Sequence, residues 1–316
     1  MAGSTHASLT ADGIGPPVAA ARRSRPVTPG WEAWRRFRRH HLAVAGAVVL
    51  VAMVLTVAIG PYIWRVPINA IDFSAQLASP SFAHPLGTDS LGQDLLARML
   101  YGGRISIAVG LVAMAVAVIF GTLIGALAGV APGAVDAFLM WLTDLFLSLP
   151  QLPFLLLIIY LFRHSLTAMV GEQLGIFILI CIVIGGFQWM PVARLVRAQI
   201  LSLREKEFVE AARALGASTS RQVVRHILPN ALGPVIVAGT IYVAQAIIAE
   251  STLDFLGLGF PPDVPTWGRI LYDGQNYLDI APHWALFSGG AIFITVLAIN
   301  FVGDGLRDAL DPRKVI

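Results

Sequence analysis

Three carboxylates lie inside long apolar stretches of this chain, and their type and position make them the first candidates for chemistry. They are Asp144, Glu250 and Asp254. A charged side chain near the centre of a membrane-spanning helix costs about 2.5–3.5 kcal/mol on insertion scales. Glu250 and Asp254, four residues apart, fall on one face of a helix. Two roles fit, and the pattern leaves both open: lining a water-filled path that a cationic solute follows, or making polar contacts to neighbouring helices and loops.

The other reactive residue types exclude several kinds of site. The sequence lacks the His-Glu-x2-His, Gly-x-Ser-x-Gly and paired metal-ligand patterns. The single cysteine, Cys181, allows no internal disulfide and no thiolate cluster. Neither Lys206 nor Lys314 follows a glycine, so a phosphate-binding loop of the Gly-Lys-Ser/Thr kind is absent. We predict no catalytic residue and no metal site, and if nucleotide drives this protein, another subunit binds it.

Composition places these residues in a membrane. Of 316 residues, 56% are hydrophobic and 13% are charged, with a mean hydropathy of +0.73. Soluble domains carry about 25% charged residues, so a soluble enzyme is excluded and a polytopic membrane protein is predicted. Residues 1–30 have the composition of a disordered tail. Residues 31–60 combine a basic, aromatic interfacial anchor with an apolar run too long for a signal peptide.

Six apolar runs are long enough to cross a bilayer, which predicts an all-α fold. They cover about 41–60, 105–130, 135–161, 176–193, 234–256 and 284–303. The segments between and after them are polar: 61–104, 194–233, 257–283 and the tail 304–316. Pro150 and Pro153 interrupt the third run, and either a kink that opens a cavity or ordinary helix curvature follows from them.

Basic residues orient the chain. Seventeen of the 22 Lys and Arg lie in residues 1–40, in 194–233 or near the C-terminus. Because cytoplasmic segments are enriched in Lys and Arg, we predict that these segments and both termini face the cytoplasm. The segments 61–104 and 257–283 then lie outside.

One ridge of small residues is suited to close helix packing. Gly121, Gly125 and Gly129 recur every fourth residue in the second run. Such ridges let two helix backbones approach closely. The partner helix belongs either to this chain or to another subunit, and the spacing does not distinguish the two.

The predicted cytoplasmic loop at 194–233 forms a helix–turn–helix. Apolar and charged residues alternate with helical spacing over 200–214, and Gly216 can take a positive φ and end that helix. Ser218 or Thr219 can cap a second helix that runs to about His226, with Pro229 after it.

The motif in this loop resembles the EAA loop of inner-membrane permeases from bacterial ABC importers. The residues that carry the resemblance are Glu210, Ala211, Ala212, Gly216, Leu228 and Pro229. In that family the loop couples the permease to an ATPase, which is the role the resemblance implies here. The family pattern has an apolar residue where this chain has His226, with Ile227 next.

Two further segments narrow the resemblance to dipeptide and oligopeptide permeases. Residues 84–94 and 101–106 look like the extracytoplasmic entry to the second span in that group, and residues 253–268 resemble the segment after its fifth span. The extra first span with a basic leader resembles the second, C-type permease of the pair. The resemblance covers roughly residues 31–312.

The resemblance implies a type I importer permease: five core spans within 105–303, a peripheral first span, and alternating access. It implies a bacterial inner-membrane location and import of di- or oligopeptides, with nickel, glutathione or cationic peptides as alternative cargo. The partners would be a homologous permease, two cytoplasmic ATPases that bind ATP and Mg²⁺, an extracytoplasmic binding protein and membrane lipid. No cofactor is expected in this chain, and nothing suggests nucleic acid. A secondary transporter and an intramembrane enzyme are the rival classes.

Overall fold

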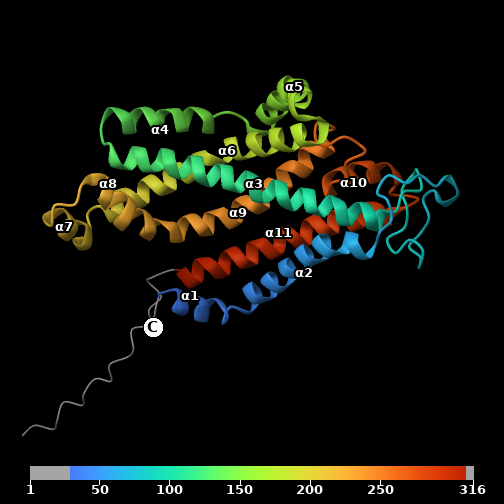
Figure 1. The fold of residues 1–316 in the computed structure, drawn as a ribbon, viewed down its shortest axis with the longest axis horizontal. Helices are drawn as coiled ribbons and strands as arrows, with labels where there is room; N and C mark the ends of the chain where they lie inside the picture. The colour runs from blue at the N-terminus through green and yellow to red at the C-terminus, as the bar shows by residue number, and fades with distance from the viewer. Residues whose placement is uncertain (1–28, 311–316) are drawn as a thin grey trace, which may run out of the picture.

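The computed structural model describes residues 29–310, and Figure 1 shows that they form a bundle of long helices. The predictions for residues 1–28 and 311–316 lie outside this range. The helices are α1 (Pro29–Phe37), α2 (His41–Ile63), α3 (Leu95–Val130), α4 (Ala134–Leu147), α5 (Gln151–Val170), α6 (Glu172–Leu203), α7 (Glu207–Ala214), α8 (Thr219–Gln222), α9 (Leu228–Phe255), α10 (Trp267–Gly274) and α11 (Pro282–Leu310). A π-helical turn, Val223–Ile227, joins α8 to α9, and short 3₁₀ turns cover Phe73–Ala75 and Gln275–Tyr277. No strand occurs in the described range.

Six helical segments are long and apolar enough to span a bilayer, as predicted. Several bounds differ from the prediction. The second span begins at Leu95 rather than 105, because Asp94 caps α3 by accepting a hydrogen bond from the Ala97 N–H at 2.8 Å. Arg104 in the first turns of α3 does not interrupt the helix, since its Nε donates to the Val57 carbonyl at 2.7 Å. Polar residues with bound partners thus extend a span beyond its apolar run.

The third predicted span, 135–161, is not one helix. Proline lacks an N–H and disfavours the α conformation in the residue before it, so α4 ends at Leu147 and α5 begins only after Pro150. With 14 residues, α4 is about 21 Å long, too short for a hydrocarbon core of about 30 Å. The 20 residues of α5 have the length and hydropathy of a span. Pro150 therefore makes a full break rather than a kink or gentle curvature, and Pro153 lies in the first turn of α5, where a proline is tolerated.

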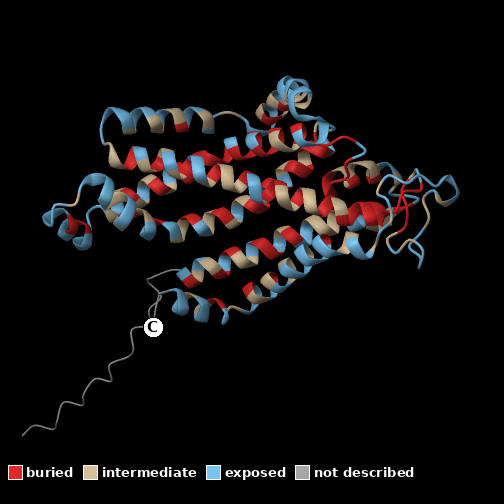
Figure 2. Ribbon diagram, in the orientation of Figure 1, coloured by how far each residue is buried: buried red, intermediate tan, exposed pale blue. Residues whose placement is uncertain are grey.

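The centre of the bundle is α6, which packs along α3. In its most apolar window, 72% of residues are buried, against 17% for α2 and 11% for α5. Figure 2 shows the same division, with buried residues concentrated on α3, α6 and α9 and exposed ones on α2, α4 and α5. The outer helix α2 contacts α11 and α3, as expected for a peripheral first span.

The glycine ridge of α3 faces α6 of the same chain. A Cβ on Gly121 would lie 2.7 Å from the Trp189 carbonyl oxygen, and one on Gly129 would lie 2.9 Å from the Ile200 Cβ. A Cβ on Gly125 would lie 2.9 Å from the Val196 Cβ. Of the two packing partners that the sequence allowed, the structure places the helix of this chain against the ridge.

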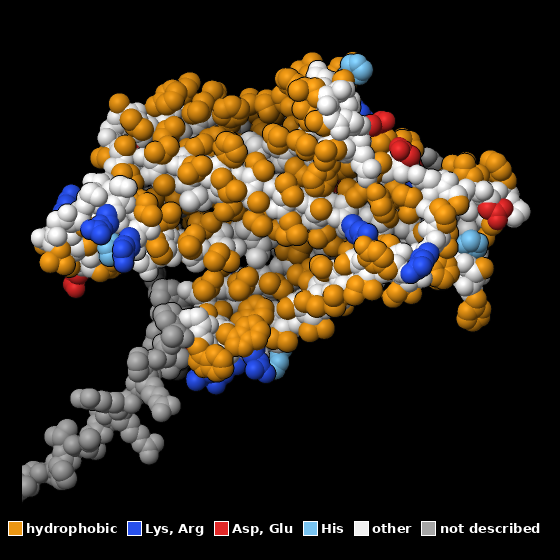
Figure 3. Space-filling view, in the orientation of Figure 1, with side chains coloured by type: hydrophobic (Ala, Val, Ile, Leu, Met, Phe, Trp, Pro, Cys, Tyr) orange, Lys and Arg blue, Asp and Glu red, His pale blue; other side chains and the backbone are white. Residues whose placement is uncertain are grey.

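The bundle has two chemically distinct ends. One carries α1, α7 and α8, and we call it the α7 end; the other carries α10 and the segment between α2 and α3, and we call it the α10 end (Figure 1). Hydrophobic side chains cover the surface between the ends, and Lys and Arg gather over α7, α8 and α1 (Figure 3). The described segments predicted to be cytoplasmic therefore share one end.

Candidate functional site

The α7 end presents a short helical hairpin. Two turns, at 204–206 and 215–218, bound α7, so the continuous helix predicted over 200–214 is broken between α6 and α7. Gly216 has φ +84° and ends the hairpin's first helix, as predicted. Ser218 caps α8, its hydroxyl oxygen accepting from the Arg221 N–H at 3.4 Å.

One face of α7 packs against the bundle and the other is open. Val209 and Ala212 are buried, and Val209 joins an apolar cluster with Val196 and Ile200. Ala212 is therefore part of the core rather than of the exposed small-residue face that the sequence suggested. Glu210 and Ala211 are exposed, and the outward face also includes two large apolar side chains that the motif did not single out, Phe208 (43% exposed) and Leu215 (89%).

The second arm of the hairpin continues into α9, so the helix predicted to end near His226 does not end there. The π-helical turn 223–227 carries one residue more than an α-helical turn. Within this turn Ile227, 2% exposed, is buried, whereas His226 is only half-buried. Leu228 and Pro229 form the first turn of α9, where a proline is tolerated.

The two acids near the α10 end of α9 are fully buried inside this chain. Glu250 and Asp254 each have 0% exposure. Ser106 of α3 donates to Glu250 Oε1 at 3.3 Å, and the Phe260 N–H donates to Asp254 Oδ1 at 2.6 Å. Asp254 Oδ2 accepts from the hydroxyl of Thr266, the residue that caps α10. These contacts support the structural role, in which the acids hold the loop 257–266 onto α3 and α9.

The third acid, Asp144, lies elsewhere and is exposed. Asp144 lies on α4 and forms an ion pair with Arg194 of α6. Nearer the α7 end of the same helix, Asp136 accepts two hydrogen bonds from Arg197, at 2.5 and 2.6 Å. The structure therefore does not bring Asp144 together with Glu250 and Asp254. Their predicted place on a translocation path stays a prediction.

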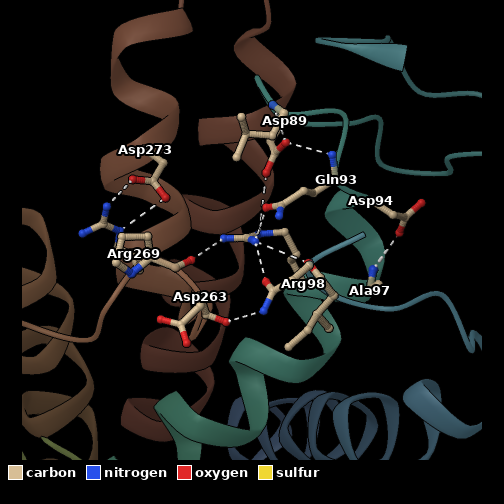
Figure 4. Close-up of polar contacts among 12 residues, drawn as sticks. Asp89, Gln93, Asp94, Ala97, Arg98, Asp263, Arg269 and Asp273 are labelled. Atoms are coloured by element: carbon tan, nitrogen blue, oxygen red, sulfur yellow. Dashed lines mark hydrogen bonds and ion pairs between the residues drawn. The ribbon is translucent and has the colours of Figure 1, made fainter. Parts of the chain in front are cut away.

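A buried arginine joins the two segments of the α10 end (Figure 4). Arg98, 4% exposed, donates to the Pro262 carbonyl at 3.2 Å and to Asn69 Oδ1 at 3.3 Å, and it also contacts Gln93. Its Nε lies 3.8 Å from Oδ2 of Asp89. We call Arg98 with these partners the Arg98 cluster. It connects residues 61–94 to residues 257–266.

Two carboxyls, Asp89 in this cluster and Asp273 beside it, have raised pKa values. Burial raises the pKa of Asp89, although Arg98 and the backbone N–H groups of Gln93 and Leu91 act in the opposite direction. Burial also raises the pKa of Asp273, which pairs with Arg269 at 3.0 Å along α10. Sequence analysis assigned residues 84–94 to a family motif but did not identify Arg98, because its partners lie as far as 164 residues away.

Within residues 29–310, no group of three or more His, Cys, Asp or Glu side chains has the arrangement of a metal site. The described residues form a membrane bundle with an exposed hairpin at one end. At the other end, hydrogen bonds join residues 61–94 to residues 257–266, and we call these two segments the loop platform. This arrangement defines the class: a multi-pass helical membrane protein.

The chain belongs to the family of binding-protein-dependent transport system inner membrane components, which matches residues 121–316. Residues 28–80 match the N-terminal membrane domain of oligopeptide transport permease C. The chain is therefore a multi-pass inner-membrane permease subunit of an ABC transporter, a kind of protein that works with an ATPase and a binding protein.

Three relatives align along nearly the whole chain. The oligopeptide transport system permease protein OppC of Escherichia coli is 42% identical over 89% of this chain and 90% of its own length. The dipeptide transport system permease protein DppC of Alkalihalophilus pseudofirmus is 35% identical over 91% of both. The glutathione transport system permease protein GsiD of Pectobacterium atrosepticum is 37% identical over 90% of this chain and 92% of its own length.

Proposed function

We propose that this chain is one of two permease subunits of an ATP-driven importer that carries di- and oligopeptides into the cytoplasm. The exposed α7 hairpin is the observation that carries the proposal. Phe208, Ala211 and Leu215 leave an apolar surface at its tip, which projects from the bundle at the end rich in Lys and Arg. Exposed apolar patches of this kind mark protein-binding surfaces. The names of the relatives support peptides as the cargo.

In this proposal the α7 end is cytoplasmic, as are both termini. The distribution of Lys and Arg supports that orientation. The hairpin, with Glu210, Ala211 and Gly216 on it, seats in a groove of an ATPase subunit and moves with it as a rigid lever. The chain lacks a phosphate-binding loop, so ATP and Mg²⁺ bind to two partner ATPases. The permease itself then hydrolyses no ATP and holds no cofactor.

At the opposite end, the extracytoplasmic binding protein docks on residues 61–94 and 257–281. The Arg98 cluster keeps these two segments together as one surface, and the Asp254 contacts hold the second segment onto α9. A second, homologous permease completes the pathway. The pathway opens to alternate sides of the membrane as the two ATPase subunits close on each other and separate.

The test reconstitutes the chain with its partner permease, ATPases and binding protein in liposomes and measures ATP-dependent uptake of a labelled tripeptide. We expect uptake by the wild-type complex and none without ATP. Gly216→Val places a branched residue at φ +84°, a strain of about 1–3 kcal/mol, and should leave ATP hydrolysis without uptake or prevent ATPase assembly.

Gly133→Val is the matched control. Gly133 also has a positive φ, +99°, and open space around it, but it lies in the turn between α3 and α4. Because the ψ of Gly133 is −133°, outside the left-handed helical region, Gly133→Val should carry a strain at least as large as that of Gly216→Val and still retain uptake. Equal uptake by both variants and the wild type would show that the hairpin does not couple the subunits.

Glutathione transport is the second candidate, because one relative carries that name. Competition separates the two cargoes: unlabelled glutathione should reduce tripeptide uptake less than an unlabelled tripeptide at equal concentration. The reverse order would reassign the cargo.

A further inference from the structure

A polar hollow lies between α5, α6 and α9 within the membrane-spanning part of the bundle. Its volume is about 370 Å³, and its lining combines apolar side chains with Gln151 of α5, Gln188 of α6, and Gln245 and Thr252 of α9. No Lys, Arg, Asp or Glu lines it. We call it the glutamine hollow. It lies beside the break between α4 and α5, because Gln151 is the first residue after Pro150.

The amides of the glutamine hollow lack partners within the described part of the chain. Gln188 is 5% exposed, and its Oε1 is buried and accepts no hydrogen bond from residues 29–310. Gln245 lies in the middle of α9 and is exposed on the isolated chain. Polar groups at membrane depth are tolerated where they meet other polar groups or water, not where they face lipid. These side chains therefore face either a wet pathway or another polar molecule.

The position of the buried acids strengthens this reading. Gln245, Ile248 and Thr252 repeat at helical spacing along the outward face of α9, whereas Glu250 and Asp254 point into the chain and are fully buried. The surface that α9 offers to a pathway is thus uncharged, with the amide of Gln245 and the hydroxyl of Thr252, rather than acidic. A glutamine amide carries both donors and an acceptor, and it matches the N–H and C=O of a peptide bond.

We propose that the glutamine hollow is this chain's half of the peptide site and that it binds the backbone amides of the cargo. This proposal rests on the proposed function and adds two points: where the peptide binds and which of its chemical groups the site recognises. Small-ligand sites usually measure about 300–1,000 Å³. The hollow is at the lower end of that range and open on one side, so the second permease completes it. Because only backbone groups are read, the site accepts peptides whatever the charge of their side chains.

The first test compares trialanine, trilysine and triglutamate as cargo for the reconstituted complex. Gln245→Leu keeps the approximate side-chain volume and removes the amide. The KM for uptake should rise about two- to tenfold, which corresponds to the free energy of one neutral hydrogen bond. The factor should be the same for all three peptides. A trialanine with N-methylated internal amides should be a poor substrate of the wild type and lose nothing further in Gln245→Leu. Gln173→Leu, at the α10 end of α6, is the matched control and should leave KM unchanged.

The outcomes separate this proposal from the proposed function. If the wild-type complex shows no ATP-dependent tripeptide uptake, the proposed function fails. If it transports trialanine and Gln245→Leu has the same KM, or loses only charged peptides, the glutamine hollow is not the backbone site. Reduced assembly with an unchanged KM in the assembled fraction would mean that the amides bind the partner permease, which also overturns the proposal.

Cysteine labelling gives a second measurement, because the chain has a single cysteine, Cys181, in its core. In a Cys181→Ala background, Gln245→Cys should react with a membrane-impermeant thiol reagent, and trialanine should protect it. Ile294→Cys, on the exposed face of α11, is the control and should stay unlabelled. No labelling of Gln245→Cys in any nucleotide state, or labelling that trialanine does not affect, would contradict a peptide site there.

Discussion

Replacing Arg98 with methionine should loosen the loop platform at the α10 end while leaving the spans in place. Arg98 holds the loop after α9 to residues 61–94 by its part-buried bond of 3.2 Å to the Pro262 carbonyl, beside an exposed bond of 3.0 Å from the Asn69 amide to the Asp263 carbonyl. Methionine fills much of the same volume but donates no hydrogen bond. The variant therefore removes the part-buried link, keeps the exposed Asn69–Asp263 bond, and leaves the Asp89 carboxylate, 4% exposed, without its counter-charge.

The cost can be worked from these contacts. Removing one member of a buried ion pair typically costs about 3–5 kcal/mol. Asp89 keeps two backbone donors, the N–H groups of Leu91 at 2.8 Å and Gln93 at 2.9 Å, so we expect the lower part of the range, about 3–4 kcal/mol. At 1.4 kcal/mol for each factor of ten, the platform should open roughly a hundred to a thousand times more often.

Hydrogen exchange of the assembled complex, followed by mass spectrometry of peptides from 61–94 and 257–266, measures this opening. Arg269→Met is the control, because Arg269 pairs only four residues along α10 with Asp273 and does not join the two segments. It should change exchange by about tenfold or less. Equal exchange in Arg98→Met and the wild type, or equal effects of the two variants, would refute the role assigned to the Arg98 cluster.

Three further predictions concern packing, the buried acids and pH. Gly125→Ala should destabilise the chain by about 1–3 kcal/mol, as measured by thermal unfolding, because the new methyl group would press on α6. Gly186→Ala, with open space around the glycine, is the control and should leave the melting temperature unchanged. Equal melting temperatures for the two variants would contradict the α3–α6 packing. Glu250→Gln combined with Asp254→Asn should reduce uptake of trilysine and trialanine equally, since both acids hold the loop; selective loss of trilysine would instead place them on the path. Burial raises the pKa of Asp89, so the folded chain binds a proton at this carboxyl more tightly than the unfolded chain does. The folded state is therefore stabilised as pH falls through the raised pKa towards 3.8. Hydrogen exchange at 257–266, corrected for its intrinsic rate, should slow over the same range. In Asp89→Asn that pH dependence should shrink, and a dependence of unchanged size would assign it to another group.

The properties that the sequence predicted depend on short-range information. A span is recognised from some twenty consecutive apolar residues, so the number of spans follows from hydropathy, as α2 and α11 illustrate. A left-handed turn is recognised from a single residue, which is why Gly216 was identified as the end of a helix. The family motif in the hairpin is equally local.

Hydropathy was less informative where polar residues have partners or where proline intervenes. It placed the start of the second span ten residues late, since Asp94 and Arg104 look like loop residues until their bonds to Ala97 and Val57 are known. It also merged α4 and α5, because Pro150 adds little to a hydropathy average but removes the backbone conditions for a continuous helix.

Tertiary structure alone decided which side chains meet. The sequence allowed Glu250 and Asp254 to face either water or protein, and their burial depends on the approach of Ser106 and the loop at Phe260 and Thr266. The link from Arg98 to Pro262 spans 164 residues, and no periodicity in either segment encodes it. Such contacts are fixed by how α3, α9 and the loop platform pack together. Burying a charge carries a large cost in free energy, and that cost is offset only when all of the partners of the charge are in place.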